Sequence, residues 1–288
     1  MDTILLTPNT LKELQINLND AIENTAFISG GTDMILNLRE HGFRDRSLID
    51  LSGINELKFI IETDNEITIG ALTTLSEISE HELIKKHAPM LAKAADCVGS
   101  TQIRNVATIG GNIANAFAGA DLIPPLFALD AKIDIIGKNH NKRTVLINDF
   151  LLGNRKNCLK FDEMVKQVRF EVQPSMQYFG KIGARKRVTI SKLNIAVKIT
   201  LREKTIESVR IAFGALGQKA FLSEIAEKLL INKDIDTIEL EDLKSVFIEQ
   251  VDLAIPSRQS RIYKRDAVIS LAEELYQIIQ IEKEVYYE

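Results

Sequence analysis

Two short glycine-rich segments have the residue types and spacing that could bind an anionic ligand. The first is Ile28-Ser29-Gly30-Gly31-Thr32-Asp33-Met34 and the second is Thr108-Ile109-Gly110-Gly111-Asn112. Glycine lets the backbone approach a ligand closely or adopt a positive φ angle, and main-chain N–H groups at a turn into a helix attract phosphate. Two such segments, far apart in the sequence, fit the two phosphates of a dinucleotide better than a mononucleotide.

Polar side chains near the second segment add to this chemistry. Thr108 and Asn112 are short enough to donate hydrogen bonds to phosphate or ribityl oxygens. Asp121 follows in a run of small residues, and its carboxylate could accept hydrogen bonds from a ligand hydroxyl or ring N–H. Two structural alternatives stay open: Asp121 could cap the helix that starts near Leu122, and each glycine pair could be a plain strand-to-helix turn.

Other common catalytic and nucleotide-binding patterns are absent from the sequence. It contains no GxGxxG, GxxxxGK(S/T) or GxSxG motif. The four histidines form no HExxH motif or close pair, and the two cysteines, Cys97 and Cys158, are far apart. This pattern argues against a histidine base, a disulfide framework, a metal site and an iron–sulfur cluster in this chain. We therefore expect no metal ligands and no catalytic side chain here.

The composition is that of a globular protein with a sizeable core. Apolar residues make up 45% of the 288 residues, charged residues make up 26%, and the formal net charge is −4. An acidic chain gives no support for nucleic-acid binding, which needs a basic surface. The first residues lack a signal-peptide pattern, and no apolar run approaches the ~20 residues of a membrane span. We expect a soluble, cytoplasmic protein without a membrane span.

The first glycine segment is predicted to join a strand to a helix. Thr10 and Glu13 have the spacing of a capping box at the start of an earlier helix. A strand at 26–29, the glycine turn, a helix at 34–39 and a strand at 47–51 follow. Together they predict a small βαβ-type unit.

The middle of the chain has the pattern of an α+β region with a mostly antiparallel sheet. The predicted elements are strands at 57–63 and 66–72 around a tight turn at Asp64-Asn65, helices capped by Thr74/Glu77 and Ser79/Glu82, a helix at 90–98, and strands at 132–136, 144–147 and 164–170.

A second domain is predicted beyond Pro174, so that the domains are 1–174, with subdomains of about 1–53 and 54–174, and 175–288. Its predicted elements are strands at 177–182, 195–201 and 206–215, and helices from about Lys219, from Ile238 with an Asp236/Glu239 box, and over 259–282. Two basic runs, 181–187 and 258–265, fit an exposed or interface surface. The first run could instead place cations beside a cofactor.

Five segments, in this order, resemble the flavoprotein (medium) subunit of the molybdenum hydroxylases, the relatives of xanthine, carbon monoxide and nicotinate dehydrogenases. AFISGGTDM, GSTQIRNVATIGGNIANA and GADLIPPLFALDA resemble the amino-terminal part of that subunit, and KIGARKRVTISKLNIAV and SRIYKRDAV its carboxy-terminal domain. The resemblance covers nearly the whole chain, and QIRNVATIGGNIANA is its most specific segment.

The resemblance implies an α+β fold. It consists of a two-subdomain PCMH-type FAD-binding domain, made of a small βαβ unit and a mostly antiparallel sheet with helices, followed by an α+β carboxy-terminal domain with a three-stranded antiparallel sheet. FAD would lie between the two subdomains. The chain would be the electron-transfer subunit of a FAD-dependent oxidoreductase. It would pass electrons from the 2Fe-2S clusters of a small subunit to an acceptor such as NAD, while a molybdopterin-binding large subunit oxidises the substrate.

The resemblance also implies the cofactor contacts. The glycine segments would hold the pyrophosphate, Asp121 would reach the ribityl or ring-edge region, Lys181 would contact the cofactor, and Val98 and Val165 would lie near the flavin. The complete predicted set is Phe27, Ile28, Ser29, Gly30, Gly31, Thr32, Asp33, Met34, Val98, Gln102, Thr108, Ile109, Gly110, Gly111, Asn112, Asp121, Val165 and Lys181.

Two alternatives belong to other classes. A stand-alone flavin reductase of related fold would need a proton donor beside the ring, and the matching segments contain no histidine or cysteine for that role. A non-catalytic scaffold could keep the fold without the cofactor. The oxidised substrate is selected in another subunit, so xanthine, nicotinate, carbon monoxide and aldehydes all stay open.

Overall fold

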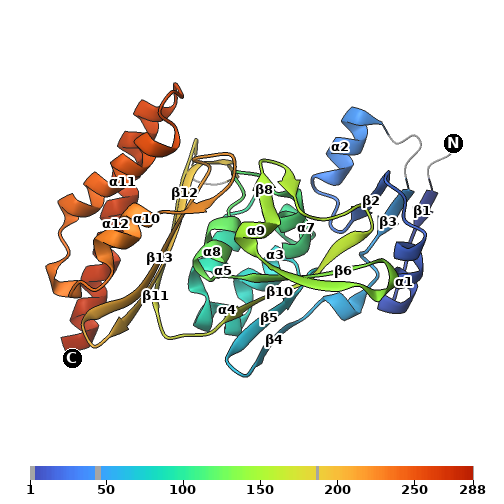
Figure 1. Ribbon diagram of the computed structural model, residues 1–288, viewed down its shortest axis with the longest axis horizontal. Helices are drawn as coiled ribbons and strands as arrows, with labels where there is room; N and C mark the ends of the chain where they lie inside the picture. The colour runs from blue at the N-terminus through green and yellow to red at the C-terminus, as the bar shows by residue number, and fades with distance from the viewer. Residues whose placement is uncertain (1–3, 43–46, 186–187, 288) are drawn as a thin grey trace.

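The computed structural model describes residues 4–42, 47–185 and 188–287. Within these residues, three main sheets follow one another along the long axis of the molecule (Figure 1). The sheet of the amino-terminal strands lies at one end, a five-stranded sheet lies in the middle, and the sheet of the carboxy-terminal strands lies at the other end. The overall α+β architecture agrees with the prediction.

The amino-terminal sheet is parallel and has the order β1-β3-β2. Its elements are β1 (Ile4–Leu6), α1 (Leu11–Asn19), β2 (Thr25–Ile28), α2 (Met34–His41) and β3 (Ser47–Asp50). Thr10 caps α1 by accepting a hydrogen bond from Glu13 N, as its spacing predicts. The βαβ unit is confirmed, but β1 was not predicted because its three residues are too few to show a pattern.

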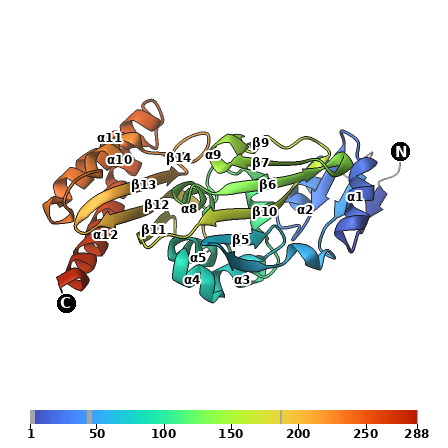
Figure 2. The ribbon, with the colours of Figure 1, turned by 60° about the horizontal axis from the view of Figure 1, so that its bottom comes forward.

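The middle sheet has the order β4-β5-β10-β6-β7, and all its neighbouring strands are antiparallel (Figure 2). The Asp64-Asn65 turn between its first two strands has positive φ at both residues, 51° and 61°, as the two-residue hairpin requires. The strands are β4 (Ile60–Thr63), β5 (Glu66–Gly70), β6 (Lys132–Gly137), β7 (Lys142–Leu146) and β10 (Glu163–Glu171).

Short helices surround this sheet and carry the second glycine segment. They are η1 (Asn55–Leu57), α3 (Leu75–Glu80), α4 (Glu82–His87), α5 (Pro89–Asp96), α6 (Thr101–Arg104), α7 (Ile109–Asn115), α8 (Ile123–Ala128), η2 (Lys138–His140) and α9 (Ile147–Phe150). A small hairpin, β8 (Leu151–Gly153) and β9 (Lys156–Asn157), follows them. The second glycine pair lies inside the first turn of α7, so it is the start of a helix rather than a separate turn.

The carboxy-terminal sheet is antiparallel with the order β11-β12-β13-β14. Its elements are β11 (Met176–Gly183), β12 (Ser191–Arg202), β13 (Thr205–Gly214), β14 (Phe221–Leu222), α10 (Glu224–Leu230), η3 (Ile235–Thr237), α11 (Leu240–Ala254) and α12 (Arg261–Tyr287). The three predicted strands are confirmed, and a fourth strand of two residues extends the sheet.

This sheet is buried on both faces. α10, α11 and α12 lie on one face (Figure 1), whereas α8, one of the helices packed around the middle sheet, contacts β12 and β13. Because side chains alternate along a strand, Leu193, Ile195 and Val197 join the core under the helices, while Ala196 joins the core of the middle domain. The apolar core therefore continues across the predicted boundary at 174, which lies between β10 and β11. The boundary itself stays a prediction.

Three predicted helix starts are wrong, and in each case a competing local interaction explains why. Ser79 lies inside α3 and donates to Ser76 O, so α4 is capped by His81 instead. The helix predicted from Lys219 begins only at Glu224, because β14 comes first and Ser223 supplies the cap. Asp236 belongs to η3 and pairs with Lys204, and α11 begins at Leu240 without a side-chain cap.

Candidate functional site

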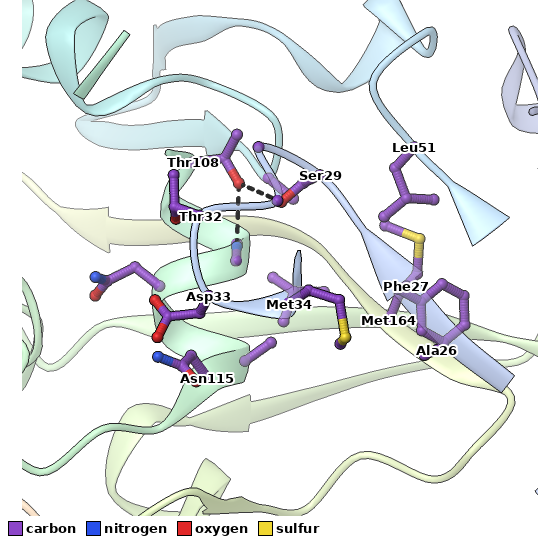
Figure 3. A pocket seen from close by; sticks show the side chains of 18 of the residues that line it. Ala26, Phe27, Ser29, Thr32, Asp33, Met34, Leu51, Thr108, Asn115 and Met164 are labelled. Carbon is purple, nitrogen blue, oxygen red and sulfur yellow. Dashed lines mark hydrogen bonds between the residues drawn. The ribbon is translucent and has the colours of Figure 1, made fainter. Parts of the chain in front are cut away.

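The two glycine segments meet in one cavity of about 580 Å³ between the amino-terminal sheet and the middle domain (Figure 3). Cavities that hold small ligands typically measure roughly 300–1,000 Å³. The predicted residues that line it are Phe27, Ser29, Gly30, Gly31, Thr32, Asp33, Met34, Val98, Thr108, Gly110, Gly111, Asn112 and Val165. Folding has thus brought together most of the predicted contacts from four separate stretches of sequence.

One hydroxyl group joins the two segments. Thr108 Oγ1 donates to Ser29 Oγ over 3.0 Å and accepts from Gly111 N over 3.2 Å, which makes Thr108 the N-cap of α7 (Figure 3). Ser29 follows β2 directly, so the end of this strand is fixed against the start of α7.

The main-chain N–H groups of the two segments are used differently. In the second segment, Ile109 N and Gly110 N donate to Thr73 O and Ala71 O, and the next two N–H groups donate to the cap residue Thr108. In the first segment, the N–H groups of residues 30–33 have no hydrogen-bond partner among the residues that the structure describes. Gly31 also has a φ of +68°, in the left-handed region that occurs in anion-binding turns. The first segment therefore offers main-chain donors to an anion, whereas the second does not, unlike the expectation that both would.

Close packing explains why several of these positions are glycine. A Cβ at Gly30 would lie 1.8 Å from Val106 O, and one at Gly110 would lie 2.7 Å from Ala71 Cβ. Both contacts are within the protein, so these two glycines hold the segments together rather than make room for a ligand. A Cβ at Gly111 would lie 2.8 Å from Ser29 Oγ, at the junction of the two segments.

Asn112 is a lining residue of the cavity and carries an unsatisfied polar atom. Its Oδ1 is buried and has no hydrogen-bond partner within the described ranges. Buried acceptors are nearly always paired, so this atom points to a ligand that donates a hydrogen bond, such as a hydroxyl group. Val98 and Val165, with Ala114 and Met164, provide apolar wall against which a flat ring can lie.

Arg155 is a cavity residue that the sequence did not reveal. It lies in the β8–β9 turn, donates to Asn115 Oδ1 over 2.9 Å, and stacks over the Phe117 ring at 5.3 Å. Its guanidinium is 3.8 Å from the Asp33 carboxylate of the first glycine segment. An arginine in a turn has no sequence signature, and only the fold brings its positive charge to the cavity.

Glu163 is a second missed lining residue, and its charge is balanced within the protein. Its carboxylate accepts from Arg143 over 3.0 and 2.7 Å and from Lys160 N over 2.9 Å. Burial alone would raise the pKa of the Glu163 carboxyl, but the hydrogen bonds from Arg143 and Lys160 outweigh it and place the pKa below its ordinary value. Glu163 is therefore ionised, and its bonds to Arg143 and Lys160 N stabilise this part of the cavity lining.

The structure places the other predicted contacts outside this cavity. Ile28 and Ile109 are not among its lining residues, and Ile109 is fully buried in the core. Gln102 and Lys181 line a second cavity of about 380 Å³, together with Cys97, Arg104 and Arg185. Lys186 and Arg187 of the same basic run lie outside the described residues.

The two cavities are neighbours. Val98 lines the first, while Cys97 and Gly99 on either side of it line the second. Arg104 holds this loop by donating to Val98 O and Gly99 O over 3.3 and 3.5 Å. One short loop, residues 97–99, therefore contributes to the lining of both cavities.

Asp121 forms a buried polar cluster with Lys181, Ser191 and Asn194. Its Oδ2 accepts from Lys181 Nζ over 2.5 Å, and its Oδ1 accepts from Ser191 Oγ over 2.5 Å and Asn194 Nδ2 over 2.9 Å. Asp121 makes no cap: α8 starts at Ile123, and its N-cap residue is Leu122, which forms no side-chain cap bond, so that alternative is wrong. Asp121 and Lys181, predicted separately, are in direct contact.

Within the described ranges, histidine, cysteine, aspartate and glutamate form no group of three or more that could hold a metal ion. In the same residues, every helix is too short or too polar to cross a lipid bilayer.

Comparisons with known proteins match both parts of the chain. The family described as "FAD binding domain in molybdopterin dehydrogenase" matches residues 2–171, and "CO dehydrogenase flavoprotein C-terminal domain" matches residues 178–279. The xanthine dehydrogenase FAD-binding subunit of Escherichia coli O157:H7 is 29% identical over 265 residues, 90% of each chain. The nicotinate dehydrogenase FAD-subunit of Eubacterium barkeri is 28% identical over 282 residues, 96% of this chain and 95% of that one.

The fold also matches a solved structure. A chain in the carbon monoxide dehydrogenase of Hydrogenophaga pseudoflava that lacks the Mo-pyranopterin moiety superposes with a TM-score of 0.84 and 24% identity. The match covers 95% of this chain and 96% of that chain. At this identity the likeness concerns the fold alone.

Proposed function

Since the chain belongs to the family of FAD-binding domains in molybdopterin dehydrogenases, we propose that it is the FAD-binding electron-transfer subunit of a multi-subunit molybdenum hydroxylase. The relatives named as FAD-binding subunits of xanthine and nicotinate dehydrogenases support this proposal along nearly their whole length. Bound FAD supplies the redox chemistry, since it exchanges one or two electrons.

One observation carries the proposal: main-chain donors and a side-chain acceptor, all without a partner in the described part of the chain, belong to residues that line the same cavity. The N–H groups of residues 30–33, which have no partner within the described ranges, are suited to the pyrophosphate, and Asn112 Oδ1 is suited to a ribityl or ribose hydroxyl. Val98 and Val165 give the flat ring system an apolar surface, and Lys181 offers an N–H group in the neighbouring cavity. The residues present therefore fit FAD, and the remaining predicted contacts, Gln102 and Asp121 included, are part of this proposal.

The proposed partners rest on two observations: the chain has too few cysteines for an iron–sulfur cluster, and its relatives are named as subunits of larger enzymes. We propose that 2Fe-2S clusters reside in a small subunit and molybdopterin in a large subunit, because the sequence contains only two cysteines. We also propose NAD as the acceptor. The protein's own contribution is to hold the cofactor between partner and acceptor.

The test is FAD binding by the purified chain and by an Asn112→Leu variant, which has a similar shape without the amide. The wild-type chain is expected to be yellow, with flavin absorbance near ~450 nm, and to bind FAD in a one-to-one ratio. Asn112→Leu is expected to bind FAD more weakly while its unfolding midpoint without FAD stays at or above that of the wild type, because it loses an unsatisfied buried atom. A wild-type chain that stays colourless after incubation with excess FAD would contradict the proposal and favour a scaffold.

One observation favours the stand-alone reductase as a second candidate. The sequence suggested no cysteine or histidine near the ring, yet Cys97 lines the second cavity. Burial raises the pKa of the Cys97 thiol, and the opposing effect of Lys181 is smaller, so the thiol keeps its proton and could donate it. Cys97→Ser should leave electron transfer in the native complex unchanged under our proposal. If the purified chain without other subunits reduces a substrate, and Cys97→Ser loses most of that activity, the reductase would be favoured.

A further inference from the structure

The cluster around Asp121 joins the two domains through a carboxylate that is almost inaccessible to solvent. Asp121 is 5% exposed, Ser191 6% and Asn194 0%. Asp121 precedes α8 in the first domain, whereas Lys181 belongs to β11 and Ser191 and Asn194 to the start of β12. An ionised carboxylate tolerates this burial only when it is well hydrogen-bonded, and here three donors converge on it.

The donors are divided unequally between the two carboxylate oxygens. Ser191 and Asn194 both bind Oδ1, which leaves Oδ2 to Lys181. Without Ser191 and Asn194, the carboxylate would be free to rotate and bind the ammonium group with both oxygens. The two β12 side chains therefore determine that Asp121 binds Lys181 through Oδ2 alone.

Lys181 has one donor to spare. An ammonium group has three N–H bonds; one is directed to Asp121 Oδ2 and another to Cys97 O over 3.0 Å. The third finds no acceptor among the residues that the structure describes, and Lys181 lines the 380 Å³ cavity. Its position, set from two sides by protein acceptors, leaves this N–H for a ligand in that cavity.

Burying the Asn194 amide costs free energy unless its hydrogen bond to Asp121 has a function. Asn194 Oδ1 is buried without a partner in the described part of the chain, and a Cβ on Gly214 would lie only 2.1 Å from it. A carboxylate only accepts hydrogen bonds, which fixes the amide with Nδ2 toward Asp121. The neighbouring inward-facing residue, Ala196, is apolar, so the fold itself does not require a polar side chain on this face.

We propose that Ser191 and Asn194 are positioning residues: they hold the Asp121 carboxylate by one oxygen, so that Lys181 keeps a fixed place and directs an N–H group toward the bound FAD. This inference rests on the proposed function. A fixed cation beside the cofactor favours its reduced, more negative form. Loss of the positioning should therefore weaken the binding of reduced FAD more than that of oxidised FAD.

The experiment measures this difference directly, by redox titration of FAD bound to the purified full chain. The variants are Ser191→Ala, Asn194→Leu and, as a reference for losing the cation, Lys181→Met. We expect each to lower the affinity ratio of reduced to oxidised FAD by roughly tenfold, the effect of one hydrogen bond to a charged group. The matched control is Thr200→Val, because Thr200 lies on the same strand and its buried hydroxyl has no partner within the described residues.

The outcomes separate this inference from the proposed function. A wild-type chain that binds no FAD contradicts the proposed function. Thr200→Val is expected to keep the wild-type affinity ratio. If the Ser191 and Asn194 variants also keep it, while they bind FAD and unfold at a lower temperature, the positioning role is contradicted and only a structural role is left. If Asn194→Leu fails to fold, Ser191→Ala decides alone, since it removes a single oxygen atom. A shift in Lys181→Met without any shift in Ser191→Ala would also overturn the proposal.

Discussion

Thr108 Oγ1 lies 3.0 Å from Ser29 Oγ, so the side chain that caps α7 also joins two segments that are 79 residues apart in the sequence. The capping bond and the joining bond can be separated by mutation. Ser29→Ala removes only the joining bond, whereas Thr108→Val removes both. Any FAD site between the segments depends on this contact, because the contact fixes the distance between them.

We expect Thr108→Val to destabilise the chain by about 1–2 kcal/mol, the range for losing an N-cap, and Ser29→Ala by less. In the double variant the two effects should fall short of additivity, because the shared bond is lost only once. Urea unfolding with and without FAD measures both quantities. Additive effects would show that the two hydroxyl groups do not interact.

Gly111 gives a second test of the same junction. A Cβ at this position would lie 2.8 Å from Ser29 Oγ and 3.1 Å from Thr108 Oγ1. We expect Gly111→Ala to destabilise the chain by about 1–3 kcal/mol through overpacking and to weaken FAD binding. Adding Ser29→Ala removes the nearest oxygen and should restore part of the loss. A double variant no better than Gly111→Ala would mean that the strain lies elsewhere.

Glu163 should make stability depend on pH in the acid range. Because its pKa is lower in the folded chain than in the unfolded one, the stability it provides is complete above the unfolded value of about 4.3 and is lost as pH falls through the lower folded value. Glu163→Gln should cost about 1–3 kcal/mol at neutral pH, since Arg143 loses its charged partner, and less at pH ~3.

The control for Glu163 is Glu82, whose carboxylate forms an exposed pair with Lys85 at 3.1 Å. Such surface pairs contribute about 0–1 kcal/mol, so Glu82→Gln should change little at any pH. Denaturant unfolding at a series of pH values compares the two variants. A constant difference between wild type and Glu163→Gln from pH 7 to pH ~3 would show that the carboxylate is not held as described.

The fold could largely be predicted because its strands and helices have clear periodicity. The Asp64-Asn65 turn and the Thr74/Glu77 box form as their residues indicate. β1 and β14 could not be predicted, since two or three residues carry no period and their pairing depends on strands far away in the sequence. Helix starts were the weakest predictions, because several polar residues near each start compete to cap it.

The site was predicted in part. The glycine segments were visible in the sequence, but the hydrogen-bonding state of their N–H groups was not, because Ile109 and Gly110 donate to a loop some forty residues earlier. Ser191 and Asn194 lie in the KIGARKRVTISKLNIAV segment, but that segment did not indicate their role, since they acquire it only when β12 is placed against Asp121. Residues whose partners lie in another domain leave no local pattern to read.

Tyr178 offers a test of how the last helix is held to its sheet. Its hydroxyl on β11 donates to Glu274 Oε2 on α12 over 2.8 Å. Burial raises the pKa of the Tyr178 phenol, and the nearby Glu274 charge raises it further, so the hydroxyl keeps its proton and remains a donor. Tyr178→Phe should lower the free energy of unfolding by about 1–3 kcal/mol, because it leaves a carboxylate without its donor.

Tyr263→Phe is the matched control, since Tyr263 is 44% exposed and its ring under Lys192 is retained. Urea unfolding should show a loss for Tyr178→Phe alone; a loss no larger than that of Tyr263→Phe would mean that the hydroxyl bond does not anchor α12.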